Sequence, residues 1–435
     1  MRFAPHTDEE IREMLAVIGR SSIEELFEQI PSQVRISRPL AMPDGVSEIE
    51  LLADMRGLAA RNVHADDAVC FAGGGAYDHF VPSVVWALAA RSEFYTSYTP
   101  YQPELSQGVL QVLFEYQSMI CELTGMEVSN ASLYDGASAL VEAVHMTLGG
   151  GRSRVLVSAG VDARAVDALR TAGRGARYEP ELFDGEPEVA GDVAAVVVQH
   201  PNVFGVLEPV RERFEAAHQG GATAIEVFDP LSLGVLAPPG EVGADIAVAD
   251  GQGLGNHLNY GGPSLGIIAG RLADVRKMPG RIVGETVDVE GRTGYVLTLQ
   301  AREQHIRREK ANSNICTNQT LMAIAATVYL GWLGPDGLAE LGRQCASKAA
   351  YAASALADVP GVALAFPGQP FFKEFSLRLP KPAGEVIDAM IERGFLAGVA
   401  MPHVADDVLV VAVTERRSRA EIDAFVAAMG EVLSQ

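Results

Sequence analysis

An alternation of short apolar runs with helical segments between residues 154 and 250 restricts the possible folds most. The runs are rich in β-branched residues and have the length of buried strands: RVLVSAG, DVAAVVVQH, TAIEVFD and DIAVAD. Segments 162–173 and 208–221 lie between the earlier runs and have helical patterns. Strands and helices in such alternation form a mostly parallel sheet with helices on both faces. The sequence therefore predicts an α/β domain.

Helical and mixed segments flank this alternation. Near the N-terminus, Thr7 or Asp8 can cap a first helix, Ser22 and Glu25 have the spacing of a capping box, and a further helix is predicted over 47–62. After the α/β region an apolar helix over 320–334 precedes strand candidates VALAF, EFSLRL and VLVVAVT. We therefore predict an N-terminal helical arm (1–60), a large α/β domain (61–320) and a small α+β domain (321–435).

The charge of the chain excludes several classes of partner. Its 34 basic and 56 acidic residues give a net charge of −22, which disfavours nucleic acid and anionic membrane surfaces. No Gly-Lys dipeptide occurs, so a Walker-type phosphate loop is excluded. The four cysteines form no CxxC pair and the histidines no HExxH, so no metal site is predicted. The N-terminus has no signal-peptide pattern, and we expect a cytoplasmic protein.

Two short motifs are weak evidence for a hydrolase or a dinucleotide-binding protein. Gly262-Pro263-Ser264-Leu265-Gly266 matches G-x-S-x-G, but a strand-like run follows the serine where a hydrolase needs a helix. We interpret these glycines as turn residues. The complete G-x-G-x-x-G fingerprint is absent, which disfavours a dinucleotide-binding fold.

Three longer segments are better candidates for a site. YTPYQPELSQG places Tyr98 and Tyr101 in a non-helical stretch, where they could line a site or, with equal weight, pack a subunit interface. LYDGASA places Gly136-Ala137-Ser138 at a helix N-terminus, whose free N–H groups favour a phosphate. REKANSNICTNQ gathers polar residues before the apolar helix, and Thr317 or Asn318 could cap that helix.

These segments, in this order around a β/α middle, resemble the glycine decarboxylase P-protein, and specifically the alpha-type chain of its two-polypeptide form. The resemblance extends almost from end to end. The longest matching runs are AYDHFVPSVVWALAARSEFYTSYTPYQPELSQG, YQSMICELTGMEVSNASLYDGASALVEA, RIVGETVDVEGRTGYVLTLQAREQHIRREKANSNICTNQ and VTERRSRAEIDAFV. Residues 150–240 are the most variable part, where only the β/α rhythm supports the comparison.

The resemblance implies the aminotransferase-like fold of pyridoxal-phosphate enzymes, fold type I. In that fold a helix N-terminus holds the cofactor phosphate, an aspartate pairs with the pyridine nitrogen, and a lysine forms the Schiff base. Gly136, Ala137 and Ser138 match the phosphate site, and Asp229 matches the aspartate. Gln252 stands where the lysine should be. An amide cannot form an imine, so we expect no catalytic residue in this chain and a vestigial cofactor pocket made by these five residues.

By the same resemblance, the beta-type chain binds pyridoxal phosphate covalently, and two alpha and two beta chains form a heterotetramer.

 The enzyme decarboxylates glycine and passes the aminomethyl group to the lipoyl arm of H-protein. The role implied for this chain is to close the partner's active site and to help dock H-protein. Tyr98, Tyr101, Asn314 and Thr317 are the residues expected to reach across, and Arg302, Arg307 and Arg308 form a candidate basic patch for H-protein.

Two alternatives remain open at this point. One is an independent pyridoxal-phosphate enzyme that uses another lysine, such as Lys310. The other is a non-catalytic scaffold or regulatory protein of the same fold. The five lysines, at 277, 310, 348, 373 and 381, are interpreted as solvated surface residues, which disfavours the first alternative.

Overall fold

The computed structural model describes residues 5–36 and 38–434 and divides into two compact units, Met1–Val63 and His64–Gln435. The first unit contains α1 (Asp8–Val17), the 3-10 turn η1 (Glu24–Phe27) and α2 (Glu48–Ala59). Thr7 caps α1 in a capping box with Glu10, as predicted. The helix predicted after Ser22 is only the short turn η1.

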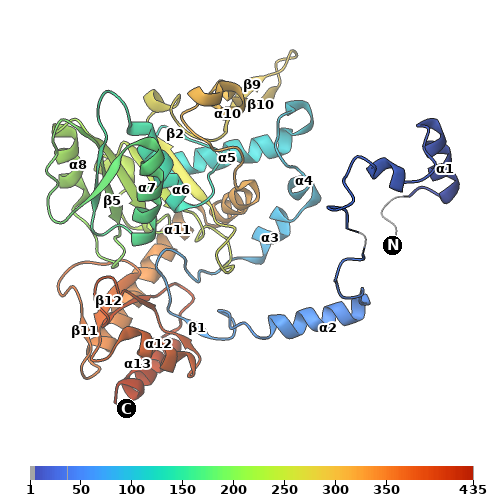
Figure 1. Ribbon diagram of the computed structural model, residues 1–435. Coiled ribbons are helices and arrows are strands. Elements are labelled where there is room, and N and C mark those ends of the chain that lie inside the picture. The colour runs from blue at the N-terminus through green and yellow to red at the C-terminus, as the bar shows by residue number, and fades with distance from the viewer. Residues whose placement is uncertain (1–4, 37, 435) are drawn as a thin grey trace. The chain divides into compact units, whose positions relative to one another are not determined.

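A seven-stranded sheet forms the centre of the second unit (Figure 1). Its strands, in spatial order, are β2 (Val128–Ser129), β8 (Gly266–Gly270), β7 (Ile246–Asp250), β6 (Thr223–Phe228), β5 (Val193–His200), β3 (Arg154–Ser158) and β4 (Glu179–Phe183). The strands from β7 to β4 pair in parallel, and β8 and β2 pair antiparallel. The predicted mostly parallel sheet is confirmed. The edge strand β4 was not predicted, because EPELF contains a proline and no β-branched residue.

Helices cover both faces of this sheet. One apolar cluster joins the sheet to α5 (Gln107–Thr124), α8 (Val210–Gln219) and the first part of α11 (Thr320–Ala357). A second cluster joins the other face to α6 (Gly136–Thr147) and α7 (Ala163–Ala176). Alternate residues of β5 supply the two clusters, as the two-residue period of a strand requires: Val196 and Val198 enter one cluster, and Val197 the other.

Several short helices and a hairpin complete the part of the chain around the seven-stranded sheet. Helices α3 (Ser83–Ala89) and α4 (Ser92–Tyr95) precede α5. The remaining short helices are α9 (Pro239–Val242) and α10 (Gln304–Arg307). An antiparallel hairpin of β9 (Ile282–Val287) and β10 (Thr293–Thr298) was not predicted. Its outer half is exposed and charged, so it lacks the apolar run of a core strand.

The C-terminal part has its own sheet and apolar cluster. Strands β11 (Ala363–Leu364), β12 (Glu374–Arg378), β15 (Val408–Ala412) and β14 (Val399–Ala400) form an antiparallel sheet in that order. It packs with α12 (Ala383–Ile391), α13 (Arg419–Ser434) and the end of α11. Strand β1 (Val69–Cys70) pairs with β13 (Phe395–Leu396). The three predicted strands are confirmed, and a domain boundary near residue 320 stays a prediction.

Helix α11 is longer than the predicted apolar helix. It bends at Gly334, whose φ of 60° and ψ of 179° are not helical, and Pro335 begins its second half. By length and composition alone α11 could cross a membrane. Its buried side chains, however, pack into the two core clusters described above, which is the pattern of a core helix.

One carboxyl group is buried on the sheet strand β6. Glu226 of β6 is 1% exposed, and its Oε2 atom has no hydrogen-bond partner among the described residues. Burial raises its pKa to about 8. The folded protein therefore keeps this carboxyl protonated at pH values at which the unfolded chain ionises it.

This shift predicts a pH-dependent loss of stability. As pH rises from 4.5 to 7, ionisation of Glu226 in the unfolded chain favours unfolding, so Glu226→Gln should gain about 3 kcal/mol relative to wild type over that range. Urea unfolding at several pH values measures the difference. Glu212→Gln, on the exposed face of α8, is the control. A difference between Glu226→Gln and wild type that does not change with pH would contradict the prediction.

Candidate functional site

A cavity of about 470 Å³ lies where the parallel strands β5, β6 and β7 end. Ligand sites of open parallel sheets form at these carboxyl ends, because the following loops diverge there. Four of the five residues predicted for the cofactor pocket line this cavity: Gly136, Ala137, Asp229 and Gln252. The fifth, Ser138, lies one residue further into α6. The structure thus brings together residues that are far apart in the sequence.

Carboxylates occupy the N-terminus of α6. Asp135 caps the helix, and its Oδ1 accepts a hydrogen bond from the Ser138 backbone N–H at 2.7 Å. Asp250, at the end of β7, accepts the Gly136 N–H at 3.1 Å. Burial raises the pKa of Asp250, whereas hydrogen bonds from Ser264, Gly136 and Gln252 lower it. Two of the donors expected to bind phosphate are therefore already used.

The serine of the G-x-S-x-G match has a structural role here. The Ser264 hydroxyl donates to Asp250, and strand β8 follows it at Gly266. A nucleophile elbow needs a helix after the serine, so the structure supports the interpretation of this motif as a turn.

Gln252 is held by the backbone on both sides of its amide. Its Oε1 accepts the Tyr77 N–H at 2.8 Å, and its Nε2 donates to the carbonyl oxygens of Tyr77 at 3.2 Å and Asn256 at 2.7 Å. The side chain is buried. Every polar atom of the amide is thus satisfied within the chain.

Asp229 forms a buried ion pair with Lys373. The Lys373 Nζ lies 2.7 Å from an Asp229 carboxylate oxygen and 3.5 Å from the centre of the Tyr77 ring, and the side chain is 2% exposed. The interpretation of Lys373 as a surface residue is therefore wrong. A lysine is buried only when a counter-charge compensates for its lost hydration, and Asp229 does this. Lys277 and Lys310 are exposed as expected.

A chain of buried polar groups continues from Lys373. Its Nζ donates to His79 Nε2 at 3.0 Å, so His79 carries its proton on Nδ1, which donates to Glu415 at 2.7 Å. Burial and the Lys373 charge lower the pKa of His79. Although burial opposes it, the hydrogen bond from His79 helps to lower the pKa of Glu415 to about 2. The two basic groups, Lys373 and His79, thus lie between two carboxylates, Asp229 and Glu415.

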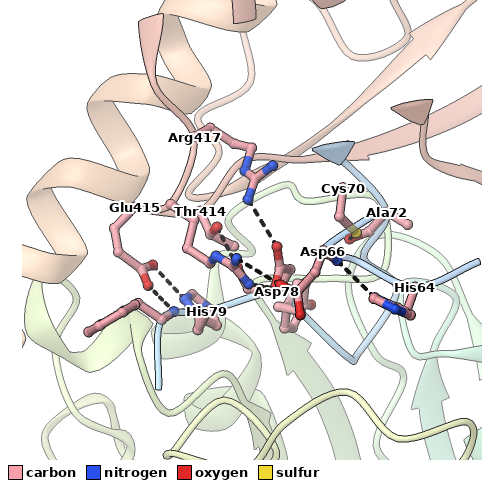
Figure 2. Close-up of polar contacts among 12 residues, drawn as sticks. His64, Asp66, Cys70, Ala72, Asp78, His79, Thr414, Glu415 and Arg417 are labelled. Carbon is pink, nitrogen blue, oxygen red and sulfur yellow. Dashed lines mark hydrogen bonds and ion pairs between the residues drawn. The ribbon is translucent and has the colours of Figure 1, made fainter. Parts of the chain in front are cut away.

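The same region joins two distant segments of sequence (Figure 2). Figure 2 shows Asp78 and His79 facing the loop after β15: Arg417 donates to Asp78 at 2.9 Å, and the Thr414 hydroxyl donates to the Asp78 carbonyl at 2.8 Å. These contacts fix the irregular segment that carries Tyr77 against the loop after β15.

A metal ion at this chain of groups is not supported. Ligand atoms of His79, Cys345 and Glu415 lie within 4.8 Å of one another. The His79 Nδ1 atom, however, donates its proton to Glu415, and the Lys373 ammonium lies against the other ring nitrogen. Neither nitrogen has a free lone pair for a metal, so we assign the group to hydrogen bonding.

The four residues expected to reach a partner lie outside the cavity lining. Tyr98 is 80% exposed, Tyr101 and Asn314 are exposed, and Thr317 is half-buried. Arg281, which the sequence reasoning missed, connects two of these loops. Its guanidinium donates to the Cys316 carbonyl and to the Tyr101 hydroxyl at 3.4 Å. No motif marks Arg281, because its main partner is a backbone oxygen.

The expected cap of α11 is wrong. Gln319 is the N-cap residue, and it makes no side-chain capping bond. Asn318 donates to the Ser132 hydroxyl at 2.8 Å and to the Ala131 carbonyl at 3.2 Å, and it accepts from Arg281 at 3.2 Å. This amide therefore ties the loop before α11 to the loop before α6.

The cavity does not fit a covalently bound pyridoxal phosphate. Gln252 replaces the lysine that forms the Schiff base, Asp250 occupies a phosphate donor, and Lys373 already pairs with Asp229. Each of the three contacts that such a cofactor needs is missing or used within the chain.

The arrangement of the sheet, the helix α6 and this cavity nevertheless defines the pyridoxal-phosphate-dependent class of fold type I. An aspartate aminotransferase from Thermus thermophilus shares the fold, with a TM-score of 0.58 at 18% identity over 84% of this chain and 99% of that chain. The fold class expected from the sequence is confirmed.

The chain belongs to the glycine cleavage system P-protein family, whose model matches residues 1–429. A probable glycine dehydrogenase (decarboxylating) subunit 1 from Chlorobium limicola is 49% identical over 441 residues, 99% of each chain. The crystal structure of an inhibitor-bound glycine decarboxylase (P-protein) of the glycine cleavage system superimposes with a TM-score of 0.93 at 48% identity, over 100% of both chains. The resemblance inferred from the sequence, to the alpha-type chain of this family, is confirmed.

The buried ion pair predicts non-additive effects on stability. Asp229→Asn or Lys373→Met alone leaves one charge buried without a partner, which costs about 3–5 kcal/mol. The double variant removes both charges, so it should lose much less than the sum of the single variants. Urea unfolding of the four proteins measures the coupling. Equal and additive losses would contradict a direct ion pair.

Proposed function

We propose that this chain is the lysine-free, alpha-type subunit of a two-chain glycine decarboxylase. The observation that carries the proposal is Gln252, which follows the end of β7 at the position where the family's active chain has its lysine. The beta-type partner would bind pyridoxal phosphate covalently, and two chains of each type would form a heterotetramer. The proposed location is the cytoplasm.

The proposed enzyme removes the carboxyl group of glycine as CO₂ and passes the aminomethyl group to the lipoyl arm of H-protein. The cofactor supplies the electron sink on the partner chain. An independent enzyme that uses Lys310 is not favoured, because Lys310 is exposed and does not line the cavity. A non-catalytic scaffold or regulatory protein of the same fold is not favoured either, because the chain matches the P-protein family and a probable glycine dehydrogenase subunit 1 over almost its full length.

The proposed task of this chain at the partner's site rests on its irregular loops. Tyr98 projects from the segment between α4 and α5, and Asn314 from the segment before α11. Arg281 contacts Tyr101 from one side and the carbonyl of Cys316 from the other, so it holds both segments in place. Polar groups on loops fixed by a rigid scaffold are well placed to complete a neighbouring site.

This role predicts a loss of activity without a loss of assembly. Tyr98→Phe and Asn314→Ala, each assembled with wild-type partner, should lower glycine–bicarbonate exchange by about tenfold or more, because each removes a polar contact to the reacting site. Tyr95→Phe, an exposed tyrosine at the end of α4, is the control. Unchanged exchange rates in an intact complex would refute the assignment of Tyr98 and Asn314.

A basic hollow is the proposed contact for H-protein. Arg276, Lys277, Arg307 and Lys310 surround a hollow of about 150 Å³ on this otherwise acidic chain. Arg302 of the expected patch is not available, since its guanidinium donates to the carbonyl oxygens of Leu299 at 3.1 Å and Gly280 at 3.0 Å. A basic surface would attract an acidic carrier protein.

Charge reversal tests this contact. Arg307→Glu and Lys310→Glu should raise the KM for H-protein several-fold at low salt and leave kcat unchanged, because surface charges act mainly on association. Steady-state kinetics at two salt concentrations measures the effect. Arg292→Glu, on the β9–β10 hairpin, is the matched control. An equal effect of Arg292→Glu would show that the KM depends only on the net charge of the complex, and would contradict a contact at this hollow.

A further inference from the structure

We propose that three side chains of this chain substitute for the cofactor and for the lysine that would hold it. Asp250 takes the place of its phosphate, Lys373 that of its ring nitrogen, and Gln252 that of the lysine that would hold it. The cavity is therefore an internally neutralised pocket that excludes pyridoxal phosphate even when a lysine is restored. This inference rests on the proposed function, in which the partner chain holds the cofactor.

The phosphate end of the pocket is closed by geometry as well as by hydrogen bonding. A Cβ atom added to Gly136 would lie 2.9 Å from the Asp250 backbone nitrogen, so the start of α6 presses directly on the end of β7. The Asp250 carboxylate accepts the Gly136 N–H, and Asp135 uses the Ser138 N–H. An incoming phosphate would meet two carboxyl groups at the helix terminus that normally attracts it.

The ring end of the pocket is closed by a cation. An aspartate enclosed here needs a positive partner, which in this fold is the protonated pyridine nitrogen. Lys373 reaches Asp229 from the start of β12, and the face of the Tyr77 ring and His79 Nε2 enclose its ammonium group. A pyridinium ring would have to displace this ammonium, and the displaced charge has no other carboxylate as close among the described residues.

Lys373 does not itself replace the missing imine-forming lysine. A nitrogen that donates to both Asp229 and His79 uses its protons to hold the network, and an ammonium ion has no lone pair for a carbonyl carbon. The pocket therefore contains a lysine that serves as a counter-ion. This distinguishes a substituted site from a site that has merely lost one residue.

Stepwise restoration of the site tests the proposal in the assembled complex. The variants are Gln252→Lys alone, Gln252→Lys with Asp250→Ala, and both of these with Lys373→Met. Each complex is treated with pyridoxal phosphate and borohydride, and the mass of this chain is measured separately from that of its partner. Wild type and Gln252→Lys should carry no pyridoxyl adduct on this chain, and the triple variant should carry one at position 252.

A second measurement, of non-covalent binding, tests the proposal if the triple variant does not fold. Asp250→Ala with Lys373→Met, in the Gln252 background, should bind pyridoxal phosphate non-covalently at least about tenfold more tightly than wild type, because two like-charge contacts are removed. Lys348→Met, which removes a lysine outside the cavity lining, is the control. Thermal melts identify the folded variants.

The possible outcomes distinguish a failure of this proposal from a failure of the proposed function on which it rests. Full labelling of Gln252→Lys alone, or a folded double variant that binds no more tightly than wild type, would overturn the substitution of the cofactor. An adduct on Lys373 of the wild-type chain would instead refute the proposed function, because this chain would then hold the cofactor itself. Exchange activity of the complex is not the readout, so loss of assembly cannot imitate either result.

Discussion

The buried ion pair between Asp229 and Lys373 is the interaction on which the cavity depends. It joins the end of β6 to the start of β12, and His79 and Glu415 extend it to the loop after β15. Two buried charges are tolerated only when each compensates the other, so removing either side chain alone would destabilise the fold. The pair thereby fixes the position of the C-terminal sheet against the carboxyl ends of the parallel strands.

The parts of the site that follow from local pattern were predictable from the sequence. The alternation of β-branched runs and helical segments predicted the parallel sheet, and LYDGASA predicted the helix N-terminus at Gly136. Asp229 and Gln252 were assigned to the pocket by the resemblance to the family. Gly136, at the start of α6, lines the same cavity. The sheet and the start of α6 depend on neighbours in the sequence, and both are present in the structure.

The parts that depend on distant partners were not predictable in the same way. Lys373 is buried because Asp229 lies against it, and nothing adjacent in the sequence specifies that contact. Arg281 is buried against a backbone carbonyl, which any residue could supply. A lysine or arginine is normally exposed, so without the fold the general tendency of the residue type gave the wrong expectation for Lys373.

Loss of a cofactor poses a physical problem larger than loss of a catalytic group. A helix N-terminus that faces a cavity has unsatisfied N–H groups, and a buried aspartate has an uncompensated charge. If only the lysine changed to Gln252, both defects would remain and would destabilise the chain whenever the cofactor was absent. Asp250 and Lys373 remove the two defects from within the chain. Under the proposed function, the fold is then kept for its loops and its contacts with a partner, and the partner chain carries out the chemistry.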